Sequence, residues 1–417
     1  MQERLENALA TINKNVLLDH AERIKGQKLK MSDPFSAGQY WVCFEMVAED
    51  GSLVIARVRL PRHPNSLSTV SEEDERYTVA CEVSTMRYVK QKLPALVVPE
   101  VYAHEGPGSQ LAADAGAAFM LLEGFYGNTL QDVTEDILSL PVDCQEHIMA
   151  QWTMTQAQLA TLKFPGIGSI CSITELGEPV IGRLSTAAAE GLVRQGPFLS
   201  STDYFTAMGE AALRRVRNRD QDRDETPFDE LGPLVFLDVV KNSGLFDGCP
   251  ERYPLNHMDL GLQNIIVDDD YNFLAVIDWE FAQTAPWQVN YYPFPFPLLD
   301  SDERIQTALL DPEDLAHWAL SRQAAARQLY SRKFREAENM LRAEGRPLEG
   351  SFCPVLDSPA SRIWHYFTRL DCSPGEEEDV VRDMVRLAFG LDKEGTDRYL
   401  ERMGHQLQTS ATPIRSG

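Results

Sequence analysis

The sequence lacks the arrangement of cysteines that a zinc site or a disulfide framework needs. Its seven cysteines are odd in number, lie far apart and include no C-x-x-C pair. It also lacks a run of about 18 apolar residues, the length that a membrane-spanning helix requires, and it is polar from its first residues onward. These absences predict a soluble, cytoplasmic protein without a membrane anchor.

Positive charge is scarce. The 417 residues include 39 Lys and Arg against 63 Asp and Glu, which gives a formal net charge of -24. Such a chain repels nucleic-acid backbones and anionic lipid surfaces, so neither is an expected partner. The charge would suit a cationic small molecule, although an acidic surface also serves solubility. The length favours two domains or lobes.

The N-terminal part carries β-strand patterns around one helix. Asp50-Gly51 lies between two β-rich runs and predicts a hairpin, because both central turn residues must tolerate positive φ. A following acidic segment has helical character up to Pro94. The predicted elements are strands at 40–44 and 53–58, a helix at 72–92, and strands at 96–102 and 118–123.

The rest of the chain is predominantly helical in pattern, with one embedded hairpin. Helices are predicted at 134–162, where Pro141 marks a start or break, and through most of 303–401. Short apolar strands at 264–267 and 273–277 flank a polar turn, and 217–230 is polar enough for an exposed loop. The predicted organisation is α+β, with a small β-rich lobe over 1–123 and a larger helical lobe over 124–417.

One stretch combines the residue types that phosphoryl transfer needs. His257, Asp259 and Asn264 form an H-x-D-x-x-x-x-N pattern, and the predicted hairpin then leads to Asp278 at the end of an apolar strand. A carboxylate can orient an attacking hydroxyl and take its proton, while an amide and a second carboxylate can hold magnesium. Because the hairpin reverses the chain, we expect Asp278 to return toward Asn264.

A metal-dependent hydrolase is the competing enzyme class, since His257 and Asp259 are also possible metal ligands. The other histidines are scattered through the sequence, so no histidine cluster supports that interpretation.

The pattern resembles the catalytic and metal-binding motifs of the aminoglycoside phosphotransferase and choline kinase superfamily, a small-molecule branch of the protein-kinase-like, two-lobed fold. The D-W-E segment from Asp278 to Glu280 favours this branch over protein kinases, whose corresponding segment is D-F-G. The resemblance implies that Asp259 is the catalytic aspartate, that Asn264 and Asp278 bind Mg²⁺, and that His257 braces the loop. ATP and Mg²⁺ are the implied cofactors.

In kinases a basic residue on the third strand binds nucleotide phosphates and a helix glutamate. Arg57 occupies that place here, as in several small-molecule members, and Glu82 falls in the helix that follows. We expect Arg57 to be an exposed phosphate contact with Glu82 as its partner. Arg59 is the alternative, because residues two apart on a strand share a face.

Two weaker signals complete the expected nucleotide site. Gly38 lies where a phosphate-covering loop should precede the first long strand, although a full G-x-G-x-x-G is absent. The apolar segment 119–125 fits the hinge between lobes, where backbone groups around Glu123 and Phe125 would meet adenine.

The expected activity is transfer of the γ-phosphate of ATP to a hydroxyl of a small-molecule acceptor. The acceptor is open, since segments 166–169 and 196–198 are similar only to uncharacterised fungal members of the superfamily. A catalytically silent pseudokinase that binds nucleotide or a partner is the alternative, favoured by Arg57 in place of lysine and by the poor glycine loop. The intact set of Asp259, Asn264 and Asp278 favours the enzyme.

Overall fold

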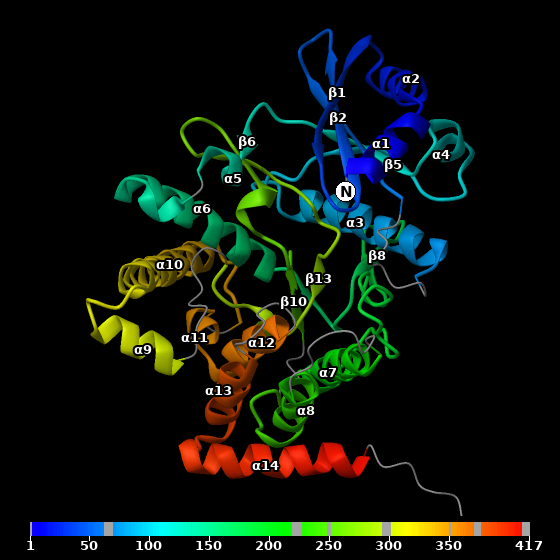
Figure 1. Ribbon diagram of the computed structural model, residues 1–417. Helices are drawn as coiled ribbons and strands as arrows, with labels where there is room; N and C mark the ends of the chain where they lie inside the picture. Colours follow the sequence, from blue (N-terminus) through cyan, green and yellow to red (C-terminus); the bar gives the residue numbers. More distant parts are fainter. Residues whose placement is uncertain are drawn as a thin grey trace, which may run out of the picture. The chain divides into compact units, whose positions relative to one another are not determined.

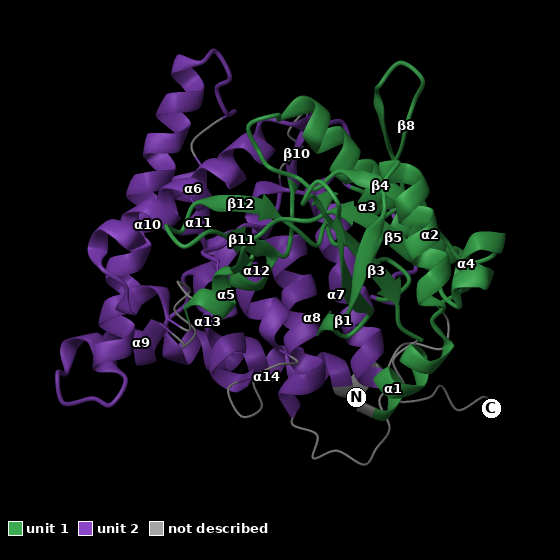
Figure 2. Cartoon of the chain, turned by 90° about the horizontal axis from the view of Figure 1, so that it is seen from above, with its two compact units in different colours: residues 1–135, 168–189, 256–283 green, residues 136–167, 190–255, 284–417 purple. Residues whose placement is uncertain are grey.

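The computed structural model describes residues 2–61, 70–134, 136–218, 227–247, 252–293, 302–349, 352–370 and 377–410. The chain forms two compact units, each assembled from separated stretches (Figure 2). Unit 1 comprises residues 1–135, 168–189 and 256–283, and unit 2 comprises 136–167, 190–255 and 284–417. The division into lobes at residue 123 stays a prediction, because these units combine segments that lie far apart in the sequence.

Unit 1 contains a five-stranded antiparallel sheet in the order β1-β2-β3-β5-β4 (Figure 1). Its strands are β1 (Leu29–Ala37), β2 (Trp41–Ala48), β3 (Leu53–Arg59), β4 (Val101–Glu105) and β5 (Phe119–Glu123). The helices of this part are α1 (Gln2–Thr11), α2 (Lys14–Lys25), α3 (Glu72–Lys92), α4 (Gln110–Ala115) and α5 (Leu130–Val133).

A second, three-stranded sheet of unit 1 has the order β12-β11-β6. It contains β6 (Asn128–Thr129), β11 (Ile265–Val267) and β12 (Phe273–Val276), with the 3₁₀ turn η2 (Leu262–Asn264) before β11. Gly127 lies so close to β11 that a Cβ there would meet the carbonyl oxygen of Val267 at 2.4 Å. Unit 1 also holds the hairpin of β8 (Ile170–Ile173) and β9 (Pro179–Ile181).

Alternation along β2 and β3 gives the large sheet two different faces. Val42, Phe44 and Met46 belong to a buried apolar cluster, as do the even-numbered residues of β3, and this cluster includes Leu17 and Ala21 of α2. The intervening residues 41, 43, 53, 55 and 57 instead line a cavity on the opposite face. The period of two along a strand therefore separates the core from the candidate site.

Helix α3 has the ends that its sequence predicts. Ser71 and Asp74 form a reciprocal capping box at its start, four acidic residues fill its first turn, and two lysines lie in its last turn. Both charge patterns complement the helix dipole. The observed bounds, Glu72–Lys92, agree with the prediction.

Other predicted elements need correction. The strand expected at 96–102 is limited to Val101–Glu105, because Pro99 has no N–H for a sheet ladder. In the turn between β2 and β3 only Gly51 has a positive φ, of 80°, so a two-residue turn with positive φ at both positions is wrong. The exposed loop expected at 217–230 lies partly outside the described residues, and its last four residues begin a helix.

Unit 2 is mainly helical. Its helices are α6 (Val142–Ala160), α7 (Ser201–Arg217), α8 (Pro227–Asn242), α9 (Asp302–Leu310), α10 (His317–Ala343), α11 (Cys353–Leu356), α12 (Pro359–Arg369), α13 (Glu377–Phe389) and α14 (Lys393–Ser410). Two 3₁₀ turns, η1 (Ile137–Ser139) and η3 (Trp287–Val289), and the strand β7 (Lys163–Phe164) complete it. The strands β10 (Tyr253–Asn256) and β13 (Gln283–Thr284) each include residues of both units.

Aromatic packing forms the core around α7, α8 and α12. Phe236 stacks on Phe367 with ring centroids 3.9 Å apart, and Phe205 meets Trp364 edge to face at 5.1 Å. Among the described helices none is both long and apolar enough to cross a bilayer. The β-sheet of the N-terminal region and the helical C-terminal part confirm the α+β class that the sequence predicts.

Candidate active site

A cavity of about 530 Å³ lies within unit 1, on the face of the large sheet that turns away from the α2 cluster. Its apolar wall comes from Leu53, Ile55, Met86 and Leu122. Its polar wall comes from β2, β3, the η2 turn and the segment after β12, through Cys43, Glu45, Arg57, Asn264, Asp278 and Glu280. The volume and the mixture of apolar surface with a few polar groups are typical of small-molecule sites.

Arg57 is the centre of the polar wall. Its Nη1 donates to Oε1 of Glu82 at 2.6 Å, and its Nη2 donates to Oδ1 of Asp278 at 3.0 Å. The guanidinium also lies 4.6 Å from the ring centroid of Trp41. Burial lowers the pKa of Arg57, but Glu82 and Asp278 raise it by more, so the group is always charged.

The structure brings Arg57 and Glu82 together as expected, but the exposed position predicted for Arg57 is wrong. Arg57 is 9% exposed and Glu82 is 1% exposed. Burial raises the pKa of Glu82, against the opposing attraction of Arg57, because a buried carboxylate loses its hydration. This ion pair is therefore part of the interior of unit 1 as well as of the cavity wall.

Arg59 makes a different set of contacts. Its Nη1 lies 3.6 Å from Oε2 of Glu280, and its guanidinium lies 5.0 and 4.9 Å from the ring centroids of Tyr40 and Trp41. It is absent from the lining of the cavity, which Arg57 joins. Of the two strand arginines, Arg57 is the one placed to contact a ligand.

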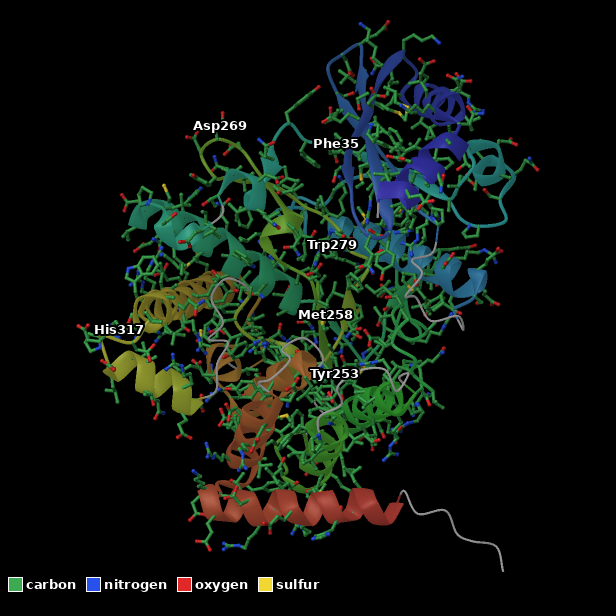
Figure 3. The ribbon with its side chains drawn as sticks, viewed as in Figure 1. Phe35, Tyr253, Met258, Asp269, Trp279 and His317 are labelled. Atoms are coloured by element: carbon green, nitrogen blue, oxygen red, sulfur yellow. The ribbon has the colours of Figure 1, made fainter. Side chains whose placement is uncertain are left out.

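In the segment after β12 one side chain is turned into the interior while its neighbours line the cavity. Trp279, labelled in Figure 3, is fully buried and its indole N–H donates to the carbonyl of Val276. Asp278 and Glu280, on either side of it, line the cavity. Asp278 has a φ of 62°, a left-handed conformation that non-glycine residues seldom adopt. Strained backbone of this kind is concentrated at functional sites, where the surrounding structure maintains it.

His257 is a buried residue that does not reach the cavity. Its Nε2 is 3.0 Å from the carbonyl oxygen of Ile277, and its ring meets Trp279 edge to face at 4.6 Å. Burial lowers its pKa to about 4, although Asp278 and the backbone oppose that shift. The imidazole is therefore neutral at pH 7 and joins its own loop to the residue before Asp278, as expected of a bracing residue.

Asp259 and Asn264 are joined directly. Nδ2 of Asn264 donates to the backbone oxygen of Asp259 at 2.7 Å and to its Oδ2 at 2.9 Å, and Gln263 donates to Oδ1 at 3.2 Å. Burial raises the pKa of Asp259, while the bond from Asn264 opposes the rise. Asp259 follows Met258, whose φ is 67°. Asn264 and Gln263 line the cavity, whereas Asp259 is not part of the lining and contacts the cavity through these two side chains.

The side chains present fit a magnesium ion that arrives with phosphates. Ile277, the neighbour of Asp278, donates its N–H to the carbonyl of Asn264 at 2.9 Å, so the chain segments bearing the two expected ligands are hydrogen-bonded. Within the described ranges no group of three or more His, Cys, Asp or Glu side chains could hold a metal. Mg²⁺ commonly takes one or two carboxylates plus substrate phosphates, which agrees with this sparse donor set.

The segment expected to meet adenine lies at the apolar end of the cavity. Oε2 of Glu123 accepts from Nζ of Lys90 and from the N–H of Glu100, both at 3.0 Å, so this side chain is already bound. The N–H of Phe125 has no hydrogen-bond partner among the described residues and is available to a ligand. Gly124 allows the strand end to approach Leu53, whose Cγ would lie 2.6 Å from an added Cβ.

Gly38 lies in the turn between β1 and β2 and lines the cavity. Its N–H donates to the carbonyl of Trp41 at 2.9 Å. A Cβ at this position would meet nothing within 4 Å, so the fold does not require glycine here. The exposed Phe35, on the strand before the turn, also lines the cavity (Figure 3).

Sequence reasoning missed Trp41 and Glu280. Nε1 of Trp41 donates to Oε2 of Glu280 at 3.1 Å, and the backbone carbonyl of Glu280 accepts from Ser185 Oγ at 3.1 Å. Glu280 could have been found from its spacing, because it lies two residues after Asp278, as Arg59 lies two after Arg57.

No protein-family model and no curated relative match the chain. Among solved structures it is similar to one from Thermobifida fusca assigned as a fructosamine-3-kinase, with 14% identity, 88% of this chain and 98% of that chain covered, and a TM-score of 0.46. It is also similar to a macrolide 2'-phosphotransferase from Brachybacterium faecium, with 17% identity, 91% of this chain and 99% of that chain covered, and a TM-score of 0.40. A choline kinase from Streptococcus pneumoniae is similar with 10% identity, 95% of this chain and 99% of that chain covered, and a TM-score of 0.38. All three are, by name, kinases or phosphotransferases of small molecules, and a further structure of that choline kinase contains AMP.

Proposed function

We propose that the protein transfers the γ-phosphate of ATP to a hydroxyl group of a small-molecule acceptor. The observation that carries the proposal is the arrangement around Arg57, which joins Glu82 of α3 to Asp278 on the wall of a cavity that Asn264 also lines. An arginine, two carboxylates and an amide on one wall can take up a triphosphate and its metal. The apolar residues of the same cavity, Leu53, Ile55, Met86 and Leu122, provide the surface for a purine ring.

Asn264 and Asp278 would hold Mg²⁺. Nδ2 of Asn264 and Oδ1 of Asp278 have hydrogen-bond partners among the described residues. The other polar atoms of these side chains, Oδ1 of Asn264 and Oδ2 of Asp278, have none there and would bind the magnesium ion. A bound magnesium ion would neutralise charge on the phosphates. Arg57 would release Asp278 and take a phosphate oxygen, while its second nitrogen stays on Glu82.

Asp259 would orient the acceptor hydroxyl and accept its proton as the new oxygen–phosphorus bond forms and the bond to the ADP oxygen breaks. Asn264 supports this role, because its donated hydrogen bond fixes Oδ2 of Asp259 and favours the ionised carboxylate against the burial that raises its pKa. His257 would hold the loop through the carbonyl of Ile277. The acceptor is a hydroxyl-bearing metabolite, and the chain's charge of -24 favours a cationic one.

Thermal unfolding with and without ligand tests the proposal. Mg-ATP at about a hundred times its dissociation constant should stabilise the native state by about 2.7 kcal/mol, because it binds the folded state alone. Asp278→Ala should remove the magnesium-dependent part of this stabilisation. ATP consumption is then measured over a panel of hydroxylated and amino-bearing metabolites.

An identical magnesium response in wild type and Asp278→Ala would contradict the metal assignment. Tight binding of Mg-ATP without turnover on any acceptor would instead favour a silent nucleotide-binding module.

A further inference from the structure

Two arginine–carboxylate pairs lie next to each other, one on the polar wall and one beside it, with matching spacing. Arg57 and Arg59 are two residues apart on β3, and Asp278 and Glu280 are two residues apart after β12. Arg57 pairs with Asp278 at 3.0 Å and Arg59 with Glu280 at 3.6 Å. The two pairs form a short ladder between the strand and the segment.

The indole of Trp41 contacts both pairs. Trp41 is opposite Arg59 in the β2–β3 register. Its ring centroid lies 4.6 Å from the guanidinium carbon of Arg57 and 4.9 Å from that of Arg59. Both arginines are thus held against one ring, and both can reach carboxylates of the same segment.

The two pairs differ in how firmly they are fixed. The Asp278 side chain is 31% exposed and has no second anchor in the described part of the chain, whereas the Glu280 side chain is 7% exposed and also accepts from the Trp41 indole. Ser185 holds the backbone carbonyl of Glu280. A ligand can therefore separate Arg57 from Asp278, whereas Arg59 and Glu280 stay paired.

Arginine is always charged, so a guanidinium that loses its buried partner turns to the nearest other carboxylate. Asp278 is the other carboxylate of this ladder, and it lies close enough to Glu280 to raise the pKa of the Glu280 carboxyl group, second only to burial. Two arginines on Asp278 would compete with a cation for the same oxygens.

Building on the proposed function, we propose that Glu280 is a positioning residue that holds Arg59 away from Asp278, so that Asp278 has only one arginine to release when magnesium and nucleotide bind. Glu280 acts through Arg59 and touches neither the acceptor nor the phosphates. This role requires the negative charge of Glu280, which pairs with Arg59, and a neutral side chain of the same shape does not supply it.

Magnesium titrations at a fixed concentration of a non-hydrolysable ATP analogue test this role, with tryptophan fluorescence and thermal unfolding as readouts. Glu280→Gln keeps an acceptor for the Trp41 indole but frees Arg59, and we expect the magnesium concentration at half-saturation to rise at least about fivefold. Adding Arg59→Gln removes the competitor and should return that value to within about twofold of wild type. A residue needed only for packing would give no such rescue.

Arg183→Gln is the matched control. Arg183 also combines a carboxylate, Asp74 at 2.8 Å, with an aromatic ring, Tyr77 at 4.3 Å, and it does not line the cavity. We expect its magnesium titration to match wild type. An unchanged titration in Glu280→Gln, or a double variant no better than Glu280→Gln alone, would overturn the proposal.

Failure of the wild type to bind the analogue with magnesium would instead overturn the proposed function. A crystal structure of Glu280→Gln separates the two outcomes, because the inference requires Arg59 to lie within about 4 Å of Asp278 whatever the ligand. Arg59 remaining at residue 280 would contradict it.

Discussion

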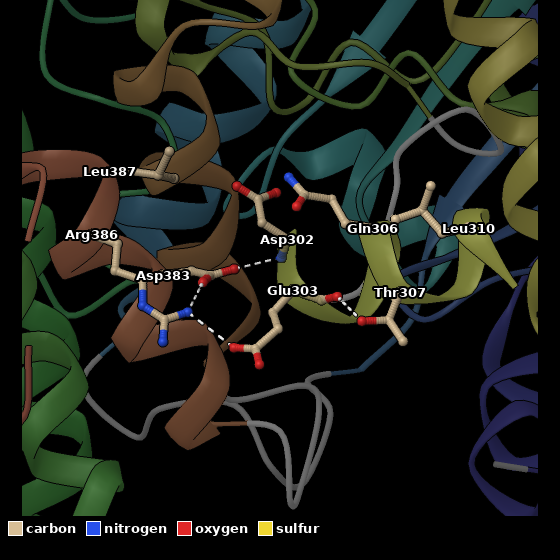
Figure 4. A pocket seen from close by; sticks show the side chains of 8 residues that line it. All are labelled: Asp302, Glu303, Gln306, Thr307, Leu310, Asp383, Arg386 and Leu387. Atoms are coloured by element: carbon tan, nitrogen blue, oxygen red, sulfur yellow. Dashed lines mark hydrogen bonds and ion pairs between the residues drawn. The ribbon is translucent and has the colours of Figure 1, made fainter. Parts of the chain in front are cut away.

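Unit 1 and unit 2 each contain a hollow that combines carboxylates with arginine, and the two hollows use these groups differently. The unit 2 pocket, of about 400 Å³, lies between α9 and α13 (Figure 4). Its Asp383 is 2% exposed and accepts from the N–H of Asp302 at 2.7 Å, at the start of α9. Arg386 lies 3.4 Å from Glu303 and 3.5 Å from Asp383.

In unit 2 the carboxylates of Asp383 and Glu303 therefore pair with Arg386, and Asp383 also caps the end of a helix, which stabilises α9 against α13. In the unit 1 cavity the oxygens assigned to magnesium and the N–H of Phe125 are left without partners among the described residues. Burial of charge alone does not identify a functional site. A candidate site needs polar atoms that remain for a ligand.

The largest expected effect is on turnover, which should depend on Asp259 of unit 1 and not on Asp383 of unit 2. Asp259→Asn keeps the shape but removes the base, so turnover should fall by about two to four orders of magnitude while Mg-ATP affinity survives. Asp383→Asn is the matched control, because it removes a buried carboxylate that caps a helix. It should lower the free energy of unfolding and leave kcat within about twofold.

Steady-state ATP consumption and calorimetric binding are measured on both variants with the active acceptor. Equal turnover in wild type and Asp259→Asn would remove Asp259 from the mechanism.

Local signals in the sequence predicted much of unit 1. The acidic helical segment that ends before Pro94 indicated α3, and the two apolar runs around the polar turn at 268–272 indicated β11 and β12. The helices α1 and α2 and the strand β1 were not predicted, because their patterns become meaningful only once they cover or extend the sheet. The compact units also bring together segments that no local pattern connects.

The sequence predicted those residues of the candidate site that belong to recognisable motifs. Asp278 was predicted from its motif spacing, and Arg57 and Glu82 from the resemblance to kinases. The structure places Glu82 and Asp278 in contact with Arg57. The burial of Arg57 and the role of Trp41 depend on strand register and on packing at a distance, which the sequence does not display. Glu280 carried a spacing signal that went unused.

Lowering the pH should change the stability contributions of His257 in unit 1 and Asp383 in unit 2 in opposite directions. The pKa of His257 is lowered to about 4 by burial, so the unfolded chain binds its proton more tightly. The stability that this group contributes is present above pH 6.5 and is lost as pH falls toward 4, up to about 3 kcal/mol. The pKa of Asp383 is raised to about 6 by burial, so its contribution is present at low pH and is lost as pH rises through 6.

Chemical denaturation between pH 4 and pH 7 checks these signs. The unfolding free energy of His257→Asn should depend less on acid than that of wild type, whereas the stability deficit of Asp383→Asn should become smaller, without vanishing, as pH rises. Parallel pH profiles for wild type and His257→Asn would contradict the buried, neutral imidazole.

Calorimetry of Mg-ATP binding to two arginine variants tests the central claim most directly, namely that the unit 1 cavity binds nucleotide phosphate through Arg57. Removing a charge-assisted hydrogen bond costs about 1.5–3 kcal/mol, so Arg57→Ala should raise the dissociation constant about 10- to 100-fold. It should also destabilise the fold by several kcal/mol, because Glu82 is left buried and unpaired, so binding is measured where circular dichroism shows the variant folded. Arg386→Ala, from the unit 2 pocket, should bind as wild type does. Wild-type affinity in folded Arg57→Ala, or an equal loss in Arg386→Ala, would contradict the claim.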